Sequence, residues 1–79
     1  MKRRRVEPPY RLDTAGQWQW SALVGELNGR ARLLTPEQRW RLACLADLQA
    51  SAKAKRLPAP DWTELQRYRE GFGLAPWQR

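Results

Sequence analysis

Apolar residues recur at helical spacing over three stretches of this 79-residue chain. The first stretch places one face at Trp20, Leu23, Val24, Leu27, Ala31 and Leu34. Because this face stays in phase beyond Gly29, it predicts a helix over about residues 15–33. The alternative is a helix that ends at Gly29, since glycine is favoured just after a helix C-terminus, with residues 30–34 as a connector.

The second and third stretches predict two more helices. A broad apolar face at Trp40, Cys44, Leu45, Leu48 and Ala52 indicates a helix over about residues 36–56. A shorter face at Trp62, Leu65, Tyr68 and Phe72 indicates a helix over about 62–70, before Gly71 and Gly73. The pattern therefore predicts an all-α fold, with a basic flexible arm over residues 1–9 and a small three-helix domain over 10–79.

Each predicted helix is preceded by a capping signal, a short polar residue followed three positions later by Glu or Gln. The three signals are Thr14–Gln17, Thr35–Gln38 and Asp61–Glu64. Such pairs satisfy backbone N–H groups that have no partner within the helix. The second is the strongest, because Pro36 stands at the first helical position, where a missing N–H costs nothing.

The residue types exclude several kinds of chemistry. The chain has one cysteine and no histidine, so it can form neither an intrachain disulfide nor an ordinary zinc site, nor a Ser–His or Cys–His nucleophile pair. Cys44 lies on the apolar face of the second helix and is expected to be a core residue. Its five glycines match no phosphate-binding motif. We expect no metal, no cofactor and no enzymatic activity.

Charge points to a partner class. The chain has fifteen basic and eight acidic residues, a net charge of +7, and four of the positive charges form one run at Lys2, Arg3, Arg4 and Arg5. A cluster of cations attracts a polyanion because each phosphate that it neutralises releases condensed counterions. The sequence therefore predicts binding to nucleic acid, DNA or RNA, or to a nucleoprotein complex.

Further cations stand near the ends of the predicted helices. The candidates for phosphate contact beyond the run are Arg39, Arg41, Lys53, Lys55, Arg56, Arg67 and Arg69. Complementarity to the helix dipole alone also accounts for a basic last turn. A helix-turn-helix with Thr63, Gln66 and Arg67 on its reading helix fits poorly, because the preceding helix is too long. Non-specific phosphate contact, or RNA contact with a stacked tryptophan, fits better.

The five tryptophans support a second hypothesis. They are more than a small core easily hides with every indole N–H satisfied, so we expect some at an interface. The candidates for a protein interface are Trp62, Phe72 and Trp77. On this hypothesis the chain is a phage or mobile-element protein–protein interaction module, an inhibitor or adaptor of a host enzyme complex, or a structural component of a particle. Spare tryptophans would also suit a homodimer.

No apolar run approaches the ~20 residues needed to cross a bilayer, and the basic start is followed by Glu7, Pro8 and Pro9 instead of an apolar signal segment. We therefore expect no membrane partner and a cytoplasmic location, or a nuclear one in a eukaryotic host.

Overall fold

The computed structural model describes residues 6–77. It contains α1 (Thr14–Glu26), the 3₁₀ helix η1 (Arg30–Leu33), α2 (Pro36–Lys53) and α3 (Ala59–Gly71). No strand occurs among residues 6–77. The predicted small all-α domain with three helices is confirmed. The basic run Lys2–Arg5 lies outside the described residues.

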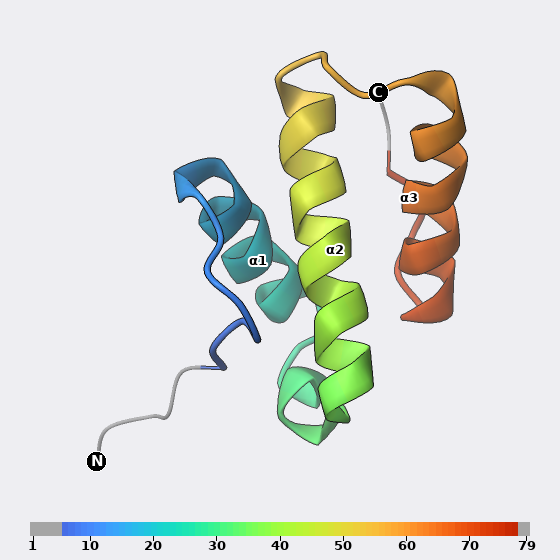
Figure 1. Ribbon diagram of the computed structural model, residues 1–79. Coiled ribbons are helices and arrows are strands. Elements are labelled where there is room, and N and C mark those ends of the chain that lie inside the picture. The colour runs from blue at the N-terminus through green and yellow to red at the C-terminus, as the bar shows by residue number, and fades with distance from the viewer. Residues whose placement is uncertain (1–5, 78–79) are drawn as a thin grey trace.

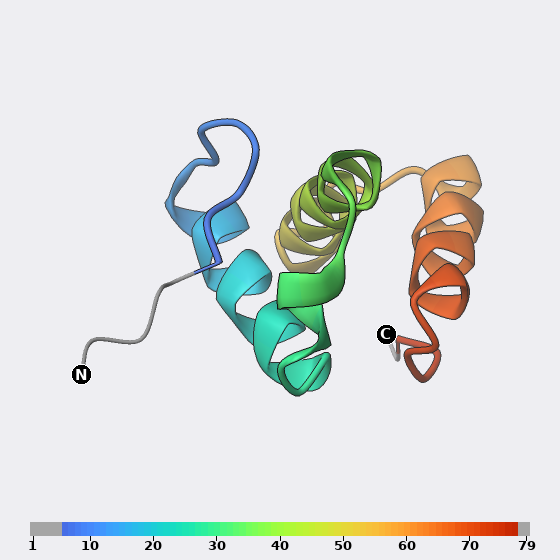
Figure 2. The same ribbon diagram turned by 90° about the horizontal axis from the view of Figure 1, so that it is seen from below.

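The central element is α2, which packs against both other helices. In Figure 1, α1 and α3 lie on either side of it and neighbouring helices run in opposite directions, and Figure 2 shows the same order from below. The fully buried core is mostly aliphatic: Leu12, Trp20, Leu23, Leu27, Ala31, Leu42, Ala43, Leu45, Ala46 and Leu65. After α3 the chain reverses and runs back along that helix (Figure 1).

The first helix is shorter than the predicted 15–33. It ends at Glu26, because Asn28 (φ 51°) and Gly29 (φ 89°) both adopt left-handed backbone that breaks the helical hydrogen-bond ladder. Ala31 is nevertheless fully buried, in η1. The apolar spacing thus predicted the burial of Ala31 correctly. Ala31 belongs to a separate 3₁₀ turn and not to α1, which agrees with the alternative prediction of a connector after Gly29.

The three helix starts follow the predicted caps to different degrees. At α2 the capping box forms as predicted, with Gln38 N donating to Thr35 Oγ1 at 3.2 Å and Thr35 N to Gln38 Oε1 at 2.8 Å. At α1 the cap is one residue earlier than Thr14, since Gly16 N donates to Asp13 Oδ1 at 2.7 Å. At α3 the helix begins at Ala59, and Asp61 lies within its first turn.

The end of α2 also differs from the prediction of residue 56. The helix ends at Lys53, and Lys55 adopts left-handed backbone (φ 58°) while Arg56 N donates to Ser51 O at 2.9 Å. This closure normally places glycine where Lys55 stands. A lysine there carries a steric cost that glycine would avoid.

A buried polar network joins the three helices and the C-terminal segment. Arg69 is 3% exposed, and its guanidinium donates to Gln49 Oε1 at 2.6 Å, to Glu26 Oε1 at 3.0 Å and to Ala75 O at 2.7 Å. Gln49 in turn donates to Gln19 Oε1 at 2.9 Å. We call Gln19, Glu26, Gln49 and Arg69 the buried network after its two buried members, Gln49 and Arg69; the Glu26 side chain at its edge is 45% exposed. Arg69 was a predicted phosphate contact; because it is buried and its donors are engaged within the protein, it is left out of the binding surface proposed below.

Residues 6–9, the part of the predicted arm that the structure describes, lie against α1. Trp20 Nε1 donates to the carbonyl oxygen of Val6 at 2.9 Å, and the Val6 side chain packs on the core. This contact satisfies the indole N–H of a buried tryptophan, as such burial requires.

Candidate nucleic-acid interface

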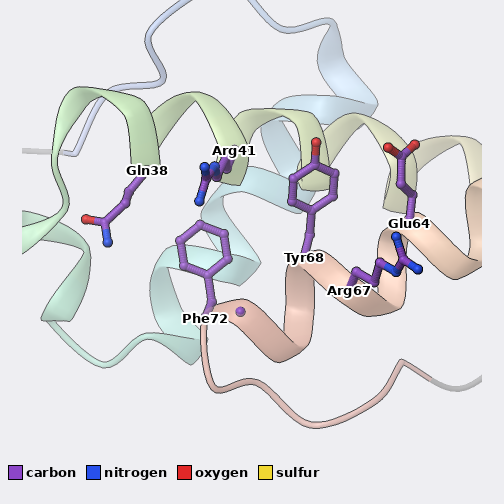
Figure 3. Close-up of a pocket in the computed structure, with 7 residues that line it drawn as sticks. Gln38, Arg41, Glu64, Arg67, Tyr68 and Phe72 are labelled. Carbon is purple, nitrogen blue, oxygen red and sulfur yellow. The ribbon is translucent and has the colours of Figure 1, made fainter.

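Three of the predicted site residues meet in a groove between α2 and α3. The α2–α3 groove has a volume of about 290 Å³ and is lined by Gln38, Arg41, Glu64, Arg67, Tyr68, Gly71 and Phe72 (Figure 3). Arg41 comes from α2 and Arg67 from α3, and Phe72 is the C-cap residue that follows α3. The packing of α3 on α2 thus brings together residues that are far apart in the chain.

Helical periodicity explains which side chains line the groove. Gln38 and Arg41 are three residues apart on α2, and Glu64, Arg67, Tyr68 and Gly71 follow each other at steps of three, one and three on α3, so each set shares one face. Tyr68 and Phe72 are half-buried and pack against the core. In Figure 3 both rings point from α3 toward α2. The groove therefore combines a partly exposed aromatic surface with two guanidinium groups.

The polar groups of the groove are only partly engaged. Arg41 Nη2 lies 3.0 Å from Glu37 Oε1, an exposed pair that contributes ~0–1 kcal/mol. Arg67 forms no ion pair within residues 6–77. The Gln38 side chain uses its oxygen in the α2 capping box, which leaves its amide hydrogens available as donors. Donors are thus in excess of acceptors in this groove, since Glu64 is its single carboxylate.

A second group of candidate residues lies at the C-terminal end of α2. Lys53, Lys55 and Arg56 are all exposed, and none has a carboxylate within 4.0 Å in the described part of the chain. Their position at a helix C-terminus is electrostatically favourable by itself. Three exposed cations within four residues also form a site at which phosphate groups can replace water.

Four more arginines remain to be placed: Arg39, a predicted phosphate contact, and three for which the sequence pattern predicts no role. Arg39 is half-buried, and its Nε is buried without a hydrogen-bond partner in residues 6–77. Arg11, Arg30 and Arg32 are exposed and were not candidates. Arg30 and Arg32 lie in η1. The alternative prediction, in which the first helix ends at Gly29, places them in a connector, and connectors are usually exposed.

The predicted protein-interface residues are half-buried. The rings of Trp62 and Trp77 pack on each other with centroids 5.9 Å apart. The Gln66 amide pairs with the backbone of Trp77, accepting from its N–H at 3.0 Å and donating to its carbonyl at 2.8 Å. The remaining candidate, Phe72, lines the groove. These contacts hold the C-terminal segment against α3.

The large apolar side chains that are exposed are different ones. Leu33 is 83% exposed, Trp18 73% and Trp40 51%. Trp18 could have been found from the sequence, because it is out of phase with the apolar face that contains Trp20, Leu23 and Leu27. Its helical neighbours Ala22 and Gly25 are small, so the indole stands clear of the α1 surface.

Tyr10 forms a polar contact outside the groove. Its hydroxyl donates to Asp47 Oδ2 at 2.9 Å and its ring packs on Trp40, with centroids 4.7 Å apart. Burial and, after it, the Asp47 carboxylate raise the pKa of Tyr10 well above its usual value, since both disfavour the phenolate. Cys44, expected in the core, is half-buried and lies 4.0 Å from the same hydroxyl.

Within residues 6–77, no three His, Cys, Asp or Glu side chains are grouped so that they could hold a metal ion. None of the helices in this described part combines the length and apolar character that crossing a membrane requires. Comparison of the chain with protein-family models, with curated proteins and with solved structures finds no match.

Proposed function

We propose that this protein binds nucleic acid, and that it does so through exposed cations without catalysing a reaction. The observation that carries the proposal is the group of Lys53, Lys55 and Arg56, exposed at one helix end with no carboxylate partner in the described residues. Unpaired cations of this kind contribute little to stability, but each can neutralise a phosphate and release a counterion.

The α2–α3 groove contributes two more cations to the proposed binding site. Arg41 and Arg67 line it from opposite helices, and a guanidinium presents paired N–H donors that suit phosphate oxygens. Arg41 and Lys53 are twelve residues apart on α2, about 18 Å along the helix axis. The two positions also differ by roughly 120° around the helix axis. One strand at roughly 3.4 Å per nucleotide therefore needs at least about five to six nucleotides to reach from one to the other.

The test is fluorescence anisotropy of labelled duplex DNA, single-stranded DNA and an RNA hairpin, each titrated at several salt concentrations. We expect the affinity to fall steeply with salt, because phosphate contacts release counterions. Replacing Lys53, Lys55 and Arg56 with alanine should weaken binding and reduce the slope of log affinity against log salt by roughly 2–3. The absence of binding to all three ligands at low salt would overturn the proposal.

The run Lys2–Arg5 is the remaining part of this proposal. Its replacement by alanine should lower the salt slope further, because its four charges stand next to one another in the sequence. The same titrations measure this change, and an unchanged slope would remove the run from the binding surface.

A second candidate function is docking on a protein, which the exposure of Trp18 and Leu33 favours. Tryptophan is among the residues enriched at binding hot spots. Sedimentation velocity of the protein and of Trp18→Ala tests the homodimer form of this candidate. A monomer at all concentrations for both proteins would exclude self-association through Trp18.

A further inference from the structure

We infer that the α2–α3 groove binds an unpaired base, so that the preferred ligand is single-stranded nucleic acid and not a duplex. The inference rests on the proposed function and adds to it the class of nucleic acid and the place where the base lies. It follows from three properties of the groove: its aromatic surface, its charge and its size.

The aromatic surface comes from Tyr68 and Phe72. Tyr68 lies in the last turn of α3 and Phe72, four residues later, is its C-cap; both are half-buried and point toward α2 (Figure 3). Their packing against the core fixes the rings, so that little side-chain entropy is lost when a ligand covers them. Every nucleobase has a π face, and stacking on protein aromatic rings is how single strands are commonly held.

The charges of the groove suit the phosphates on either side of a bound base. Arg41 and Arg67 line it from α2 and α3, against the one carboxylate of Glu64. Arg67 makes no ion pair among residues 6–77, and the exposed pair of Arg41 with Glu37 is weak enough to exchange. A polyanion therefore gains two guanidinium contacts without breaking a strong internal interaction.

The polar edge of a base also finds partners there. The free amide hydrogens of Gln38 can donate to a base carbonyl or ring nitrogen, and the Glu64 carboxylate can accept from an exocyclic amine. In a duplex these edges are largely paired and the faces are stacked on neighbouring bases. Only an unpaired base presents both to a protein side chain.

The size of the groove points the same way. Its volume of about 290 Å³ lies just below the roughly 300–1,000 Å³ of small-molecule sites. A single base with its sugar is of this scale, whereas a base pair with its two backbones is not. The aromatic, cationic and geometric properties thus agree on one occupant.

The experiment compares two labelled single strands of eight nucleotides with the same number of phosphates, one carrying bases and one abasic throughout. We expect the full-length protein to bind the base-containing strand roughly tenfold more tightly or better, the lower part of the range for stacking one or two bases. Equal affinity for the two strands would overturn this inference and leave the proposed function standing. The absence of binding to either strand would overturn this inference, and only the absence of binding to duplex DNA and to an RNA hairpin as well would overturn the proposed function.

A matched pair of glycine variants places the base in the groove. Gly71 lines the groove and Gly25 lies on the outer surface of α1, both are exposed, and a Cβ added at either meets no atom within 4 Å. Gly71→Gln should therefore fold and fill the groove. The ratio of its affinities for the base-containing and the abasic strand should then fall toward one. Gly25→Gln, which makes the same change in a different helix, should leave the preference unchanged. Equal preference in the two variants would contradict the inference.

A second pair tests stacking itself. Tyr68→Leu retains apolar volume but removes the ring, and Trp18→Leu makes the corresponding change at an exposed aromatic outside the groove. We expect the base preference to fall severalfold in the first variant and to remain in the second. A loss in Trp18→Leu alone would move the stacked base to α1 and overturn the assignment to the groove.

Discussion

The buried network and the α2–α3 groove contain the same kinds of side chain in opposite states. The network joins Gln19, Glu26, Gln49 and Arg69 through hydrogen bonds of 2.6–3.3 Å. The groove has Gln38, Arg41, Glu64 and Arg67 facing solvent, with a single surface ion pair between Arg41 and Glu37. These residue types thus stabilise the fold in one place. In the other they keep donors available for a ligand, although Gln38 Oε1 also caps α2 and Arg41 pairs weakly with Glu37.

The difference follows from burial and not from residue type. A guanidinium taken out of water needs every donor satisfied, and removing one partner leaves a costly charge behind. A guanidinium at the surface keeps its hydration, so an ion pair with a neighbouring carboxylate contributes little free energy. A phosphate can therefore displace that carboxylate. The comparison therefore predicts opposite responses of stability and of binding to mutation in the two regions.

The largest expected effect is on stability, from Arg69→Ala. The substitution leaves the buried Gln49 Oε1 without its donor and removes the bonds to Glu26 and to the carbonyl of Ala75. We expect it to lower the free energy of unfolding by roughly 1–3 kcal/mol, the cost of an unsatisfied buried polar group. Arg67→Ala, two residues earlier on α3, should change it by less than about 0.5 kcal/mol. Urea unfolding followed by circular dichroism measures both. A similar change in the free energy of unfolding for the two variants would contradict the difference between the buried network and the groove.

The next effect is on binding, from the double variant Arg41→Gln and Arg67→Gln. Loss of two phosphate contacts should reduce the salt slope for single strands by about 1.4 and weaken binding at low salt, with stability unchanged. The control Arg11→Gln and Arg32→Gln removes the same charge at two exposed sites outside the groove. Anisotropy titrations that give both double variants the same slope would show that only net charge matters.

A smaller effect is expected from Glu37→Gln. The change frees Arg41 from its ion pair and removes one negative charge beside the groove. Affinity for a single strand should rise by up to about fivefold at low salt, the equivalent of a surface pair of ~1 kcal/mol. The gain should disappear near 1 M salt, where the Debye length is about 3 Å. Weaker binding by Glu37→Gln at low salt would count against Arg41 as a contact.

The smallest effect extends the comparison to the end of α2. Lys55 has a left-handed backbone with φ 58°, so Lys55→Gly should raise the free energy of unfolding by about 0.5–1 kcal/mol. If Lys55 contacts phosphate, the same variant should reduce the salt slope by roughly 0.7–0.9. A stabilised variant with an unchanged slope would assign Lys55 no part in binding.

The elements that the sequence predicted well are those fixed by neighbours in the chain. The capping box at Thr35 and Gln38 depends on residues three apart with Pro36 between them, and it forms as expected. The end of α1 differs from the prediction, because the apolar phase continues across Gly29 while Asn28 and Gly29 turn the chain. A pattern of apolar spacing alone does not show whether the buried residues belong to one helix or to two shorter elements.

The candidate site depended on tertiary packing and was only partly predictable. Arg67 and Arg69 were treated alike, yet Arg69 lies on the same face of α3 as Leu65, four residues earlier, and this spacing was a usable sign of its burial. The meeting of Arg41 with Tyr68 and Phe72 required the register of α3 on α2. The pairing of Gln66 with Trp77 required the return of the chain along α3, for which no local signal exists.

The most direct test of the comparison is a nuclear magnetic resonance titration of the protein with a single-stranded oligonucleotide, following the side-chain amide resonances of Gln38 and Gln49. Gln38 lines the groove, whereas Gln49 is 1% exposed within the buried network. We predict that the Gln38 resonances shift in proportion to the bound fraction while those of Gln49 stay in place. Saturable binding that leaves the Gln38 resonances unmoved, or that shifts Gln49 instead, would contradict the account.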